Sequence, residues 1–238
     1  SRSLRQVIQL TFLGTGAATP SVERNVTGMM LQREGELFLF DCGEGTQRQM
    51  MRYATGFTVN EIFITHFHAD HILGLPGLMQ TMGLQDRTAP LTIYGPTGAV
   101  QLLGAVVRLG GDRPKFPLEI VELTPGEQVK KKEFAIVAGE ARHKGACLGY
   151  ALVEEDRLGR FDPDLARELG IPEGPLWGKI HRGEAVTLGD VTVVEPAMLV
   201  GPPRPGRKVV ISGDTAPCES IVELARDAGA RKVYFASA

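Results

Sequence analysis

A short apolar segment followed at once by three histidines and an aspartate constrains this chain more than any other feature. Residues 61–65 read EIFIT, and the next residues read HFHADH. A short apolar run bounded by polar residues predicts a buried strand. Side chains two residues apart lie on the same face of an extended segment, so His66 and His68 should project together from the strand end. Asp70 and His71 follow where we expect a turn into a helix, so they should point elsewhere.

The H-x-H-x-D-H spacing predicts a metal site. Zinc takes imidazole and carboxylate ligands, although manganese or iron would accept the same donors. A single buried histidine is usually structural, but this segment holds three of the five histidines of the chain. We expect His66 and His68 to share one ion, and Asp70 and His71 to hold a second ion nearby.

Polar residues also follow other predicted strands, where α/β proteins place their functional loops. His143 follows EFAIVAGEAR and would complete the first site, and Asp214 closes KVVISGD and could bridge both ions with its two oxygens. Asp41 follows FLF, where it could support the site by orienting a ligand or by fixing the glycine turn. The alternative is a purely structural hydrogen bond. His181 follows no predicted strand and is expected at the surface.

The rest of the chain reads as short strands interleaved with helices. Ile8, Leu10 and Phe12 alternate with polar residues, and residues 29–41 predict a hairpin that turns at Glu34–Gly35. Further strands are expected at 91–95, 118–123, 133–143 and 208–211. Helices are expected over 46–56 with a capping box at Thr46 and Gln49, from 71 with an interruption at Pro76, over 98–111, and over 216–229 with Pro217 near its first position and Gly229 beyond its end. This order predicts an α/β sandwich of mixed sheets covered outside by helices.

Residues 154–205 break this rhythm because proline and glycine are frequent there. We expect an insertion with little core of its own, either a protruding arm or a long surface excursion without a role.

Composition limits the partners. The formal net charge of −2 argues mildly against a nucleic-acid partner, although basic clusters occur at 129–133, 178–183 and 204–208. No apolar run approaches the roughly 20 residues of a membrane span. Three widely separated cysteines predict reduced thiols and a cytoplasmic location.

Several motifs occur in one order along the chain: FLGTGAATPS, FDCGEGTQRQM, ITHFHADHILGLPGL, IYGP, LGYALVE, IPEGPLWGKIHRGE and VVISGDT. Together they resemble the short form of ribonuclease Z, a metal-dependent endonuclease that removes the 3′ trailer of precursor tRNA. The resemblance implies a metallo-β-lactamase-type αβ/βα sandwich of two mixed sheets flanked by helices. It also implies a single domain over 1–238 with a flexible arm inserted at about 154–205.

The resemblance implies two zinc ions per subunit and a role for each motif residue. The first zinc would take His66, His68, His143 and Asp214, and the second would take Asp70, His71 and the shared Asp214. Asp70 would also act catalytically, by accepting the proton of the attacking water, and the products would be a 3′-hydroxyl on the tRNA and a 5′-phosphate on the trailer. The arm would grip precursor tRNA through Gly174, Pro175, Lys179 and Arg182. A cytoplasmic homodimer is implied as well.

The chain departs from the family pattern in two places. Val22 stands in the early loop where the family often has a lysine, which bears on discrimination of mature CCA ends. Ala236, Ser237 and Ala238 offer no ligand where the family has a final one, so the C-terminal part of the family domain is expected to be missing. We therefore expect the second zinc site to be weak or empty and the catalytic centre to be incomplete. The alternatives are another hydrolase of this fold, acting on small esters, thioesters or lactams, and a metal-poor relative that binds RNA without cutting it.

Overall fold

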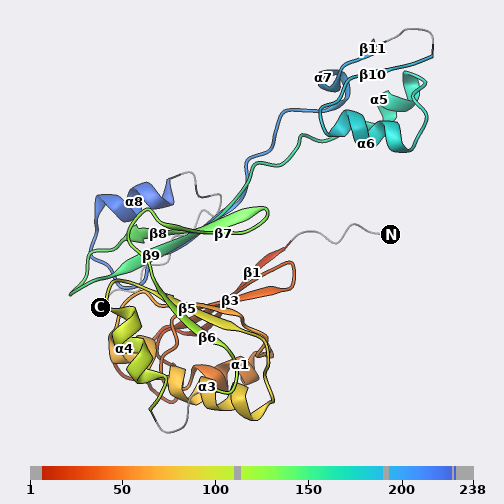
Figure 1. The fold of residues 1–238 in the computed structure, drawn as a ribbon. Helices are drawn as coiled ribbons and strands as arrows, with labels where there is room; N and C mark the ends of the chain where they lie inside the picture. The colour runs from red at the N-terminus through yellow and green to blue at the C-terminus, as the bar shows by residue number, and fades with distance from the viewer. Residues whose placement is uncertain (1–6, 110–113, 190–192, 227, 229–238) are drawn as a thin grey trace. The chain divides into compact units, whose positions relative to one another are not determined.

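The computed structural model describes residues 7–109, 114–189, 193–226 and 228 (Figure 1). Two compact units make up the chain. The first comprises residues 1–131, 135–152 and 208–238, and the second comprises residues 132–134 and 153–207. The predictions made for Gly229 and for Ala236, Ser237 and Ala238 fall outside the described residues.

A six-stranded sheet forms one half of the first unit. Its strands follow the chain order: β1 (Ile8–Gly14), β2 (Gly28–Arg33), β3 (Glu36–Phe40), β4 (Glu61–Phe63), β5 (Leu91–Gly95) and β6 (Leu118–Glu122). The first three strands are antiparallel neighbours, whereas β3, β4, β5 and β6 run parallel. The predicted hairpin is confirmed, because Arg33 pairs with Glu36 around a turn at Glu34 and Gly35. The parallel strands therefore all end at one edge of the sheet.

A four-stranded sheet forms the other half of this unit. Its order is β12 (Lys208–Ile211), β9 (Leu148–Glu154), β8 (Phe134–Glu140) and β7 (Gln128–Lys130). Aromatic rings join the two sheets: the Tyr150 ring centroid lies 5.9 Å from that of Phe40 and 5.3 Å from that of Phe63. The Tyr150 hydroxyl also donates to the Ile64 carbonyl at 2.7 Å. The sheets thus pack face to face at the end of β4.

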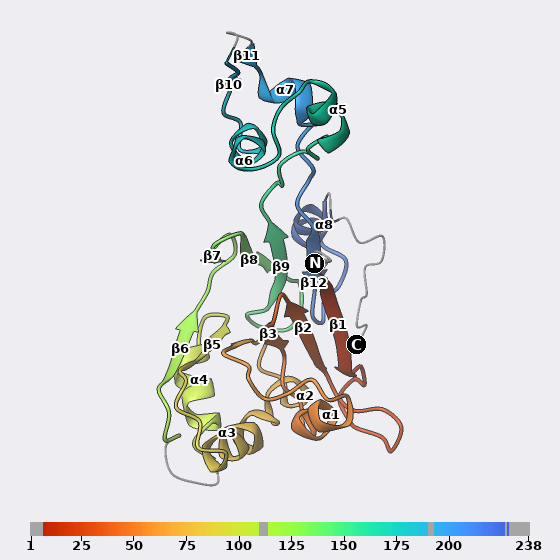
Figure 2. The same cartoon turned by 90° about the vertical axis from the view of Figure 1, so that its right-hand side faces the viewer.

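Helices cover the outer faces of both sheets (Figure 2). A single apolar cluster joins the six-stranded sheet to its helices, with Leu39, Ile62 and Ile93 among the strand residues and Leu78 and Leu103 among the helical ones. The helices on this side are α1 (Thr46–Arg52), α2 (Ala69–Ile72), α3 (Leu75–Leu84) and α4 (Ala99–Val106). Helix α8 (Glu219–Ala225) packs on the other sheet through Ile221. The predicted sandwich of two sheets flanked by helices is confirmed.

Local details differ from the sequence prediction at three helix starts. Pro76 does not interrupt a helix; it lies in the first turn of α3, where its missing N–H has no intrahelical partner to lose. Helix α1 begins after Gly45, without a side-chain cap, so the capping box at Thr46 is wrong. Pro217 precedes Cys218, which is the N-cap of α8 and stands outside the helix.

The second unit has a core of its own, so the expectation of little core was wrong. Its elements are α5 (Pro163–Glu168), α6 (Pro175–His181), β10 (Val186–Thr187), β11 (Val193–Val194) and α7 (Pro196–Leu199). Ile171, Ile180 and Leu199 are buried together, and Trp177 packs against them. The apolar residues are spread thinly among prolines and glycines, which hides this core in the sequence.

No helix among the residues that the structure describes is both long enough and apolar enough to cross a lipid bilayer.

Candidate metal centre

The carboxyl ends of strands in both sheets of the first unit supply the candidate metal ligands. His66 and His68 follow β4, and His68 is the N-cap of α2, which carries Asp70 and His71. His143 follows β8, and Asp214 follows β12. Gly213, just before Asp214, has a φ of 61°, a conformation that glycine adopts without strain. The chain therefore turns sharply enough there to aim Asp214 back at the histidines.

One group of potential ligands consists of His66, His68 and His143, whose donor atoms lie within 4.8 Å of one another. The Nε2 atom of His143 lies 3.2 Å from Nδ1 of His68. The His66 ring centroid lies 4.5 Å from that of His68 and 4.8 Å from that of His143. The expected projection of His66 and His68 toward a common point is therefore observed.

A second group joins His66, His71 and Asp214, all buried. The His71 Nε2 atom lies 3.6 Å from Oδ2 of Asp214 and 3.6 Å from Oδ2 of Asp70. The backbone N–H of Ala18 donates to Asp70 Oδ2 at 2.8 Å, so the early loop holds that carboxylate in place. The structure thus brings together all six ligands predicted from the sequence. The two groups meet at His66, whereas the sequence interpretation made Asp214 the shared residue.

Hydrogen bonds behind the histidines leave their inner nitrogens free for a metal. His71 Nδ1 lies 2.8 Å from Asp41 Oδ2, and His66 Nδ1 lies 3.0 Å from Thr65 Oγ1. The Nε2 atoms of both rings are buried and have no hydrogen-bond partner among the described residues. Buried polar atoms are almost always paired, so two adjacent exceptions indicate that something else binds there. Imidazole and carboxylate donors that converge on this point fit zinc.

The electrostatics of the pocket separate the two buried histidines. Burial, assisted by the neighbouring His71, lowers the pKa of His66 to about 4, so this ring is neutral at pH 7. Burial alone would also lower the pKa of His71, but the carboxylates of Asp41 and Asp214 outweigh it and raise this pKa to about 10. Burial would raise the pKa of Asp214, but His71 and its neighbours hold it below its ordinary value. Without metal, His71 is therefore a cation between two carboxylates.

Comparison with known proteins places the chain in a family. The ribonuclease Z of Gemmatimonas aurantiaca is 55% identical over 219 residues, which cover 91% of this chain and 70% of that protein. The chain belongs to the ribonuclease Z family. Among solved structures, the short form of human tRNase Z is 35% identical with a TM-score of 0.56, over 61% of this chain and 64% of that one.

Fold comparison agrees with this family. The metallo-β-lactamase fold protein YhfI from Bacillus subtilis is 18% identical with a TM-score of 0.52, over 61% of this chain and 58% of that one. This member of the ribonuclease Z family therefore has the metallo-β-lactamase fold, as predicted. A family model described as Anti-Pycsar protein Apyc1 matches residues 8–111, which is less than half of the chain.

The predicted RNA-binding residues lie on one helix of the second unit or at its two ends. Gly174 is the N-cap of α6, Pro175 begins it, and Lys179 lies in its last turn with an exposed side chain. Arg182 follows the helix and lies 3.4 Å from Glu184. His181, expected at the surface, is only partly exposed, and its ring lies 3.0 Å from the Gly159 carbonyl.

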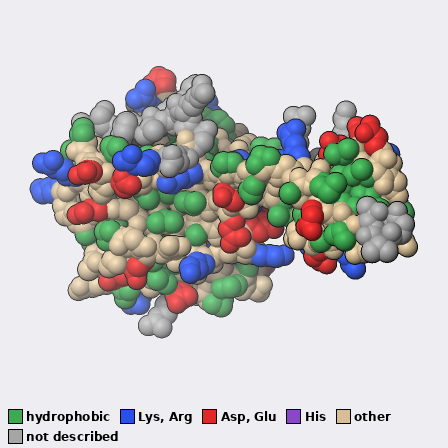
Figure 3. Space-filling view, turned by 90° about the horizontal axis from the view of Figure 1, so that it is seen from above, with side chains coloured by type: hydrophobic (Ala, Val, Ile, Leu, Met, Phe, Trp, Pro, Cys, Tyr) green, Lys and Arg blue, Asp and Glu red, His purple; other side chains and the backbone are tan. Residues whose placement is uncertain are grey.

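The second unit as a whole is not basic. It contains eight lysines and arginines against eleven aspartates and glutamates. Val193 and Met198 are half exposed, and Figure 3 shows hydrophobic side chains together on a face of this unit. Phosphate binding by this unit would therefore depend on a few cations, such as Lys179, and not on a general positive charge.

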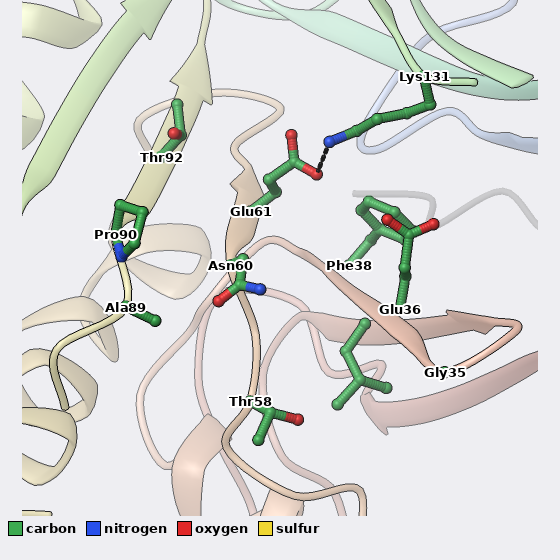
Figure 4. Close-up of a pocket in the computed structure, with 11 residues that line it drawn as sticks. Gly35, Glu36, Phe38, Thr58, Asn60, Glu61, Ala89, Pro90, Thr92 and Lys131 are labelled. Carbon is green, nitrogen blue, oxygen red and sulfur yellow. Dashed lines mark ion pairs between the residues drawn. The ribbon is translucent and has the colours of Figure 1, made fainter.

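A separate cleft of about 470 Å³ lies at the amino ends of the parallel strands. Figure 4 shows Glu61 and Lys131 pointing toward each other across it, and the two side chains form an ion pair. Glu61 is the first residue of β4, whereas the histidines follow the last residue of that strand. This cleft is therefore at the opposite edge of the sheet from the metal centre.

Sequence reasoning missed two groups that support the ligands. Thr65 contacts both Asp41 and His66, and the backbone of Ala18 binds Asp70. Thr65 stands directly before the histidine motif, and this position was the signal in the sequence that could have drawn attention to it. No side-chain pattern could have found Ala18, because its contribution is a backbone N–H.

Proposed function

We propose that this protein is a zinc-dependent endoribonuclease that cuts the 3′ trailer from precursor tRNA and leaves a 3′-hydroxyl on the tRNA and a 5′-phosphate on the trailer. The observation that carries this proposal is the pair of buried Nε2 atoms of His66 and His71. They lie close to the Asp214 carboxylate, and neither has a hydrogen-bond partner among the described residues. Membership of the ribonuclease Z family supplies the substrate class. Zinc at this point would supply positive charge that polarises a phosphoryl oxygen and lowers the pKa of water.

The residues of the chain would bind, orient and move protons around that charge. We assign His66, His68 and His143, with Asp214, to the first ion. Asp70, His71 and the shared Asp214 would hold the second. Asp70 is also the catalytic proton acceptor in this proposal, and the Ala18 N–H, at 2.8 Å, holds its Oδ2 atom in place. Asp41 orients His71 from behind.

We propose that the second ion binds more weakly than the first. The described residues offer it three donors, and one of these is shared with the first ion. Its histidine is also a cation in the absence of metal, so a proton must leave before the ring can bind. Metal analysis after dialysis, with the ions counted per chain, measures the difference in affinity.

The second unit is proposed as the arm that holds the tRNA body. Lys179 and Arg182 would contact phosphates from the exposed side of α6, and Gly174 and Pro175 would shape the approach to that helix. Replacing Lys179 and Arg182 by alanine should raise KM for precursor tRNA and leave hydrolysis of a small phosphodiester unchanged. We also propose that the protein is a homodimer, which the family resemblance supports. A cytoplasmic location is proposed as well, supported by three cysteines in the free state. Light scattering after gel filtration measures the number of copies.

A comparison of two histidine variants tests the function itself. His68→Ala removes a proposed ligand, whereas His181→Ala changes the one histidine that lies outside the cluster. We expect the first variant to lose hydrolysis of bis-p-nitrophenyl phosphate and of precursor tRNA, and the second to keep hydrolysis of the small diester.

Two other outcomes would replace the proposal. Hydrolysis of small esters or lactams with no cleavage of RNA would indicate a different hydrolase of this fold. RNA binding that survives chelation, with no cleavage at any zinc concentration, would indicate an RNA-binding relative.

A further inference from the structure

The hydroxyl of Thr65 joins the two sets of hydrogen bonds behind the metal centre. The Thr65 side chain is fully buried. Its Oγ1 atom lies 3.1 Å from Oδ1 and 2.9 Å from Oδ2 of Asp41, and 3.0 Å from Nδ1 of His66. One hydroxyl therefore contacts a carboxylate on one side and an imidazole on the other.

The donor and acceptor roles in this network can be worked out from its chemistry. An ionised carboxylate only accepts hydrogen bonds, and Asp41 Oδ1 already accepts one from the Thr65 backbone N–H at 2.8 Å. The Thr65 hydroxyl has one proton, and that proton must point at Asp41, because otherwise two negative oxygens would face a third oxygen with no proton between them. The Thr65 oxygen then accepts from His66, so Nδ1 of His66 carries the ring proton.

This direction decides which nitrogen of each histidine can bind a metal. With its proton on Nδ1, the neutral ring of His66 has a lone pair on Nε2, the atom that has no hydrogen-bond partner among the described residues. Asp41 Oδ2 accepts from Nδ1 of His71 at 2.8 Å, so Nε2 is also the inward atom of that ring. Both rings depend on the position of one carboxylate.

We propose that Thr65 is a positioning residue of the metal centre: its hydroxyl holds His66 in the Nδ1–H form and fixes the Asp41 carboxylate that orients His71. This inference rests on the metal site proposed above. It adds a residue that would contact no ion itself. Thr65 would act through His66, a proposed metal ligand, and through Asp41, which orients the proposed ligand His71.

Thr65 is packed closely between the facing sheet and the turn before Asp214. Its carbonyl accepts from the Leu148 N–H at 2.9 Å, which ties it to the facing sheet. A Cβ atom added at Gly213 would lie 2.8 Å from both Cβ and Cγ2 of Thr65, so the turn before Asp214 packs closely against this side chain. Thr65 thus contacts the turn before Asp214 as well as Asp41 and His66.

Zinc affinity separates this role from a merely structural one. Thr65→Val keeps the shape and removes the hydroxyl, and Thr65→Ser keeps the hydroxyl. Loss of a partner behind a metal-binding histidine typically weakens metal binding about 10- to 100-fold, so we expect the valine variant to bind zinc at least about tenfold more weakly. The serine variant should stay near wild type. Competition with a chromophoric chelator, without any RNA, measures both. Equal zinc affinity of the valine variant and wild type would overturn the inference.

The position of the His66 proton gives a second test that needs no variant. Long-range ¹H–¹⁵N NMR spectra of the full chain after zinc removal distinguish the two neutral forms of the ring. We expect the proton on Nδ1, and a proton on Nε2 would overturn the inference even if the valine variant failed to fold. A wild-type protein that held no zinc would contradict the metal site itself, and the His66 spectrum would still decide the role of Thr65.

Discussion

Replacing Asp41 by asparagine tests how the buried carboxylate supports the metal centre. The carboxylate is 2% exposed and accepts from the Thr65 N–H at 2.8 Å, from the Thr65 hydroxyl at 2.9 Å and from His71 Nδ1 at 2.8 Å. An asparagine has one accepting oxygen in place of two. If that oxygen faces the Thr65 N–H, the amide nitrogen donates toward His71 Nδ1, so Nδ1 must lose its proton. The ring then keeps a proton on Nε2, the atom proposed to bind metal.

The size of the effect follows from one lost hydrogen bond to a charged group. Such a bond contributes about 1.5–3 kcal/mol, so the zinc-free variant should be destabilised by roughly that amount. Zinc binding through His71 should weaken about 10- to 100-fold, or about 1.4–2.8 kcal/mol. Zinc held by His66, His68 and His143 should change less, because Asp41 reaches those rings only through Thr65.

Two assays measure these quantities. Chemical denaturation followed by circular dichroism gives the free energy of unfolding without zinc, and chelator competition gives the affinity of each ion. Asp164→Asn is the matched control, because that side chain is 87% exposed and lies in the second unit. If Asp41→Asn bound both ions with wild-type affinity and unfolded with wild-type free energy, the proposed support of His71 would be refuted.

Three further predictions concern packing and pH. Gly43→Ala should disrupt zinc binding, because the added Cβ would lie 2.2 Å from the carbonyl oxygen of Asp70. The control is Gly83→Ala, whose Cβ would have no heavy atom within 4 Å and which should stabilise the protein by roughly 0.5–1 kcal/mol. Chelator competition measures the zinc affinity of both variants, and chemical denaturation measures their free energies of unfolding. Ile180→Ala, at a fully buried position, should destabilise the second unit by about 2–5 kcal/mol and increase its hydrogen exchange, with hydrolysis of a small phosphodiester retained. The pKa of His71 is raised to about 10 in the zinc-free fold, so the stabilisation that its charge contributes should be complete below about pH 6.5 and lost as the pH rises through about 10. Free energies of unfolding measured from pH 6 to 10.5 should fall accordingly. A free energy that does not change with pH over this range would contradict the prediction.

The candidate ligands stand out in the sequence because His66, His68, His143 and Asp214 come just after strands, and Asp70 and His71 belong to the same histidine motif. His66 and His68 stand two residues apart after a short apolar run, and the structure places both in one group of donors. Their supporting network could not be predicted, because Asp41 lies 24 residues from Thr65 and 30 from His71. The direction of its hydrogen bonds depends on distances that only the folded chain provides.

The same distinction explains where the fold prediction failed. Strands and outer helices have strong periodic patterns, and the sandwich follows from them. The core of the second unit escaped detection because Ile171, Ile180 and Leu199 stand far apart among prolines and glycines. Pro76 was misread because its effect depends on whether it falls inside a helix or in its first turn, and sequence alone places helix boundaries poorly.

Mapping the ends produced from a 3′-extended precursor tRNA tests the central claim most directly. The protein would be incubated with zinc and, in parallel, with excess chelator, and both ends of the cut would be sequenced and their phosphates located. The account predicts a single zinc-dependent cut directly after the discriminator base, with a 3′-hydroxyl on the tRNA and a 5′-phosphate on the trailer. Cleavage that persists in chelator, or no cleavage by zinc-loaded protein that binds the tRNA, would contradict it.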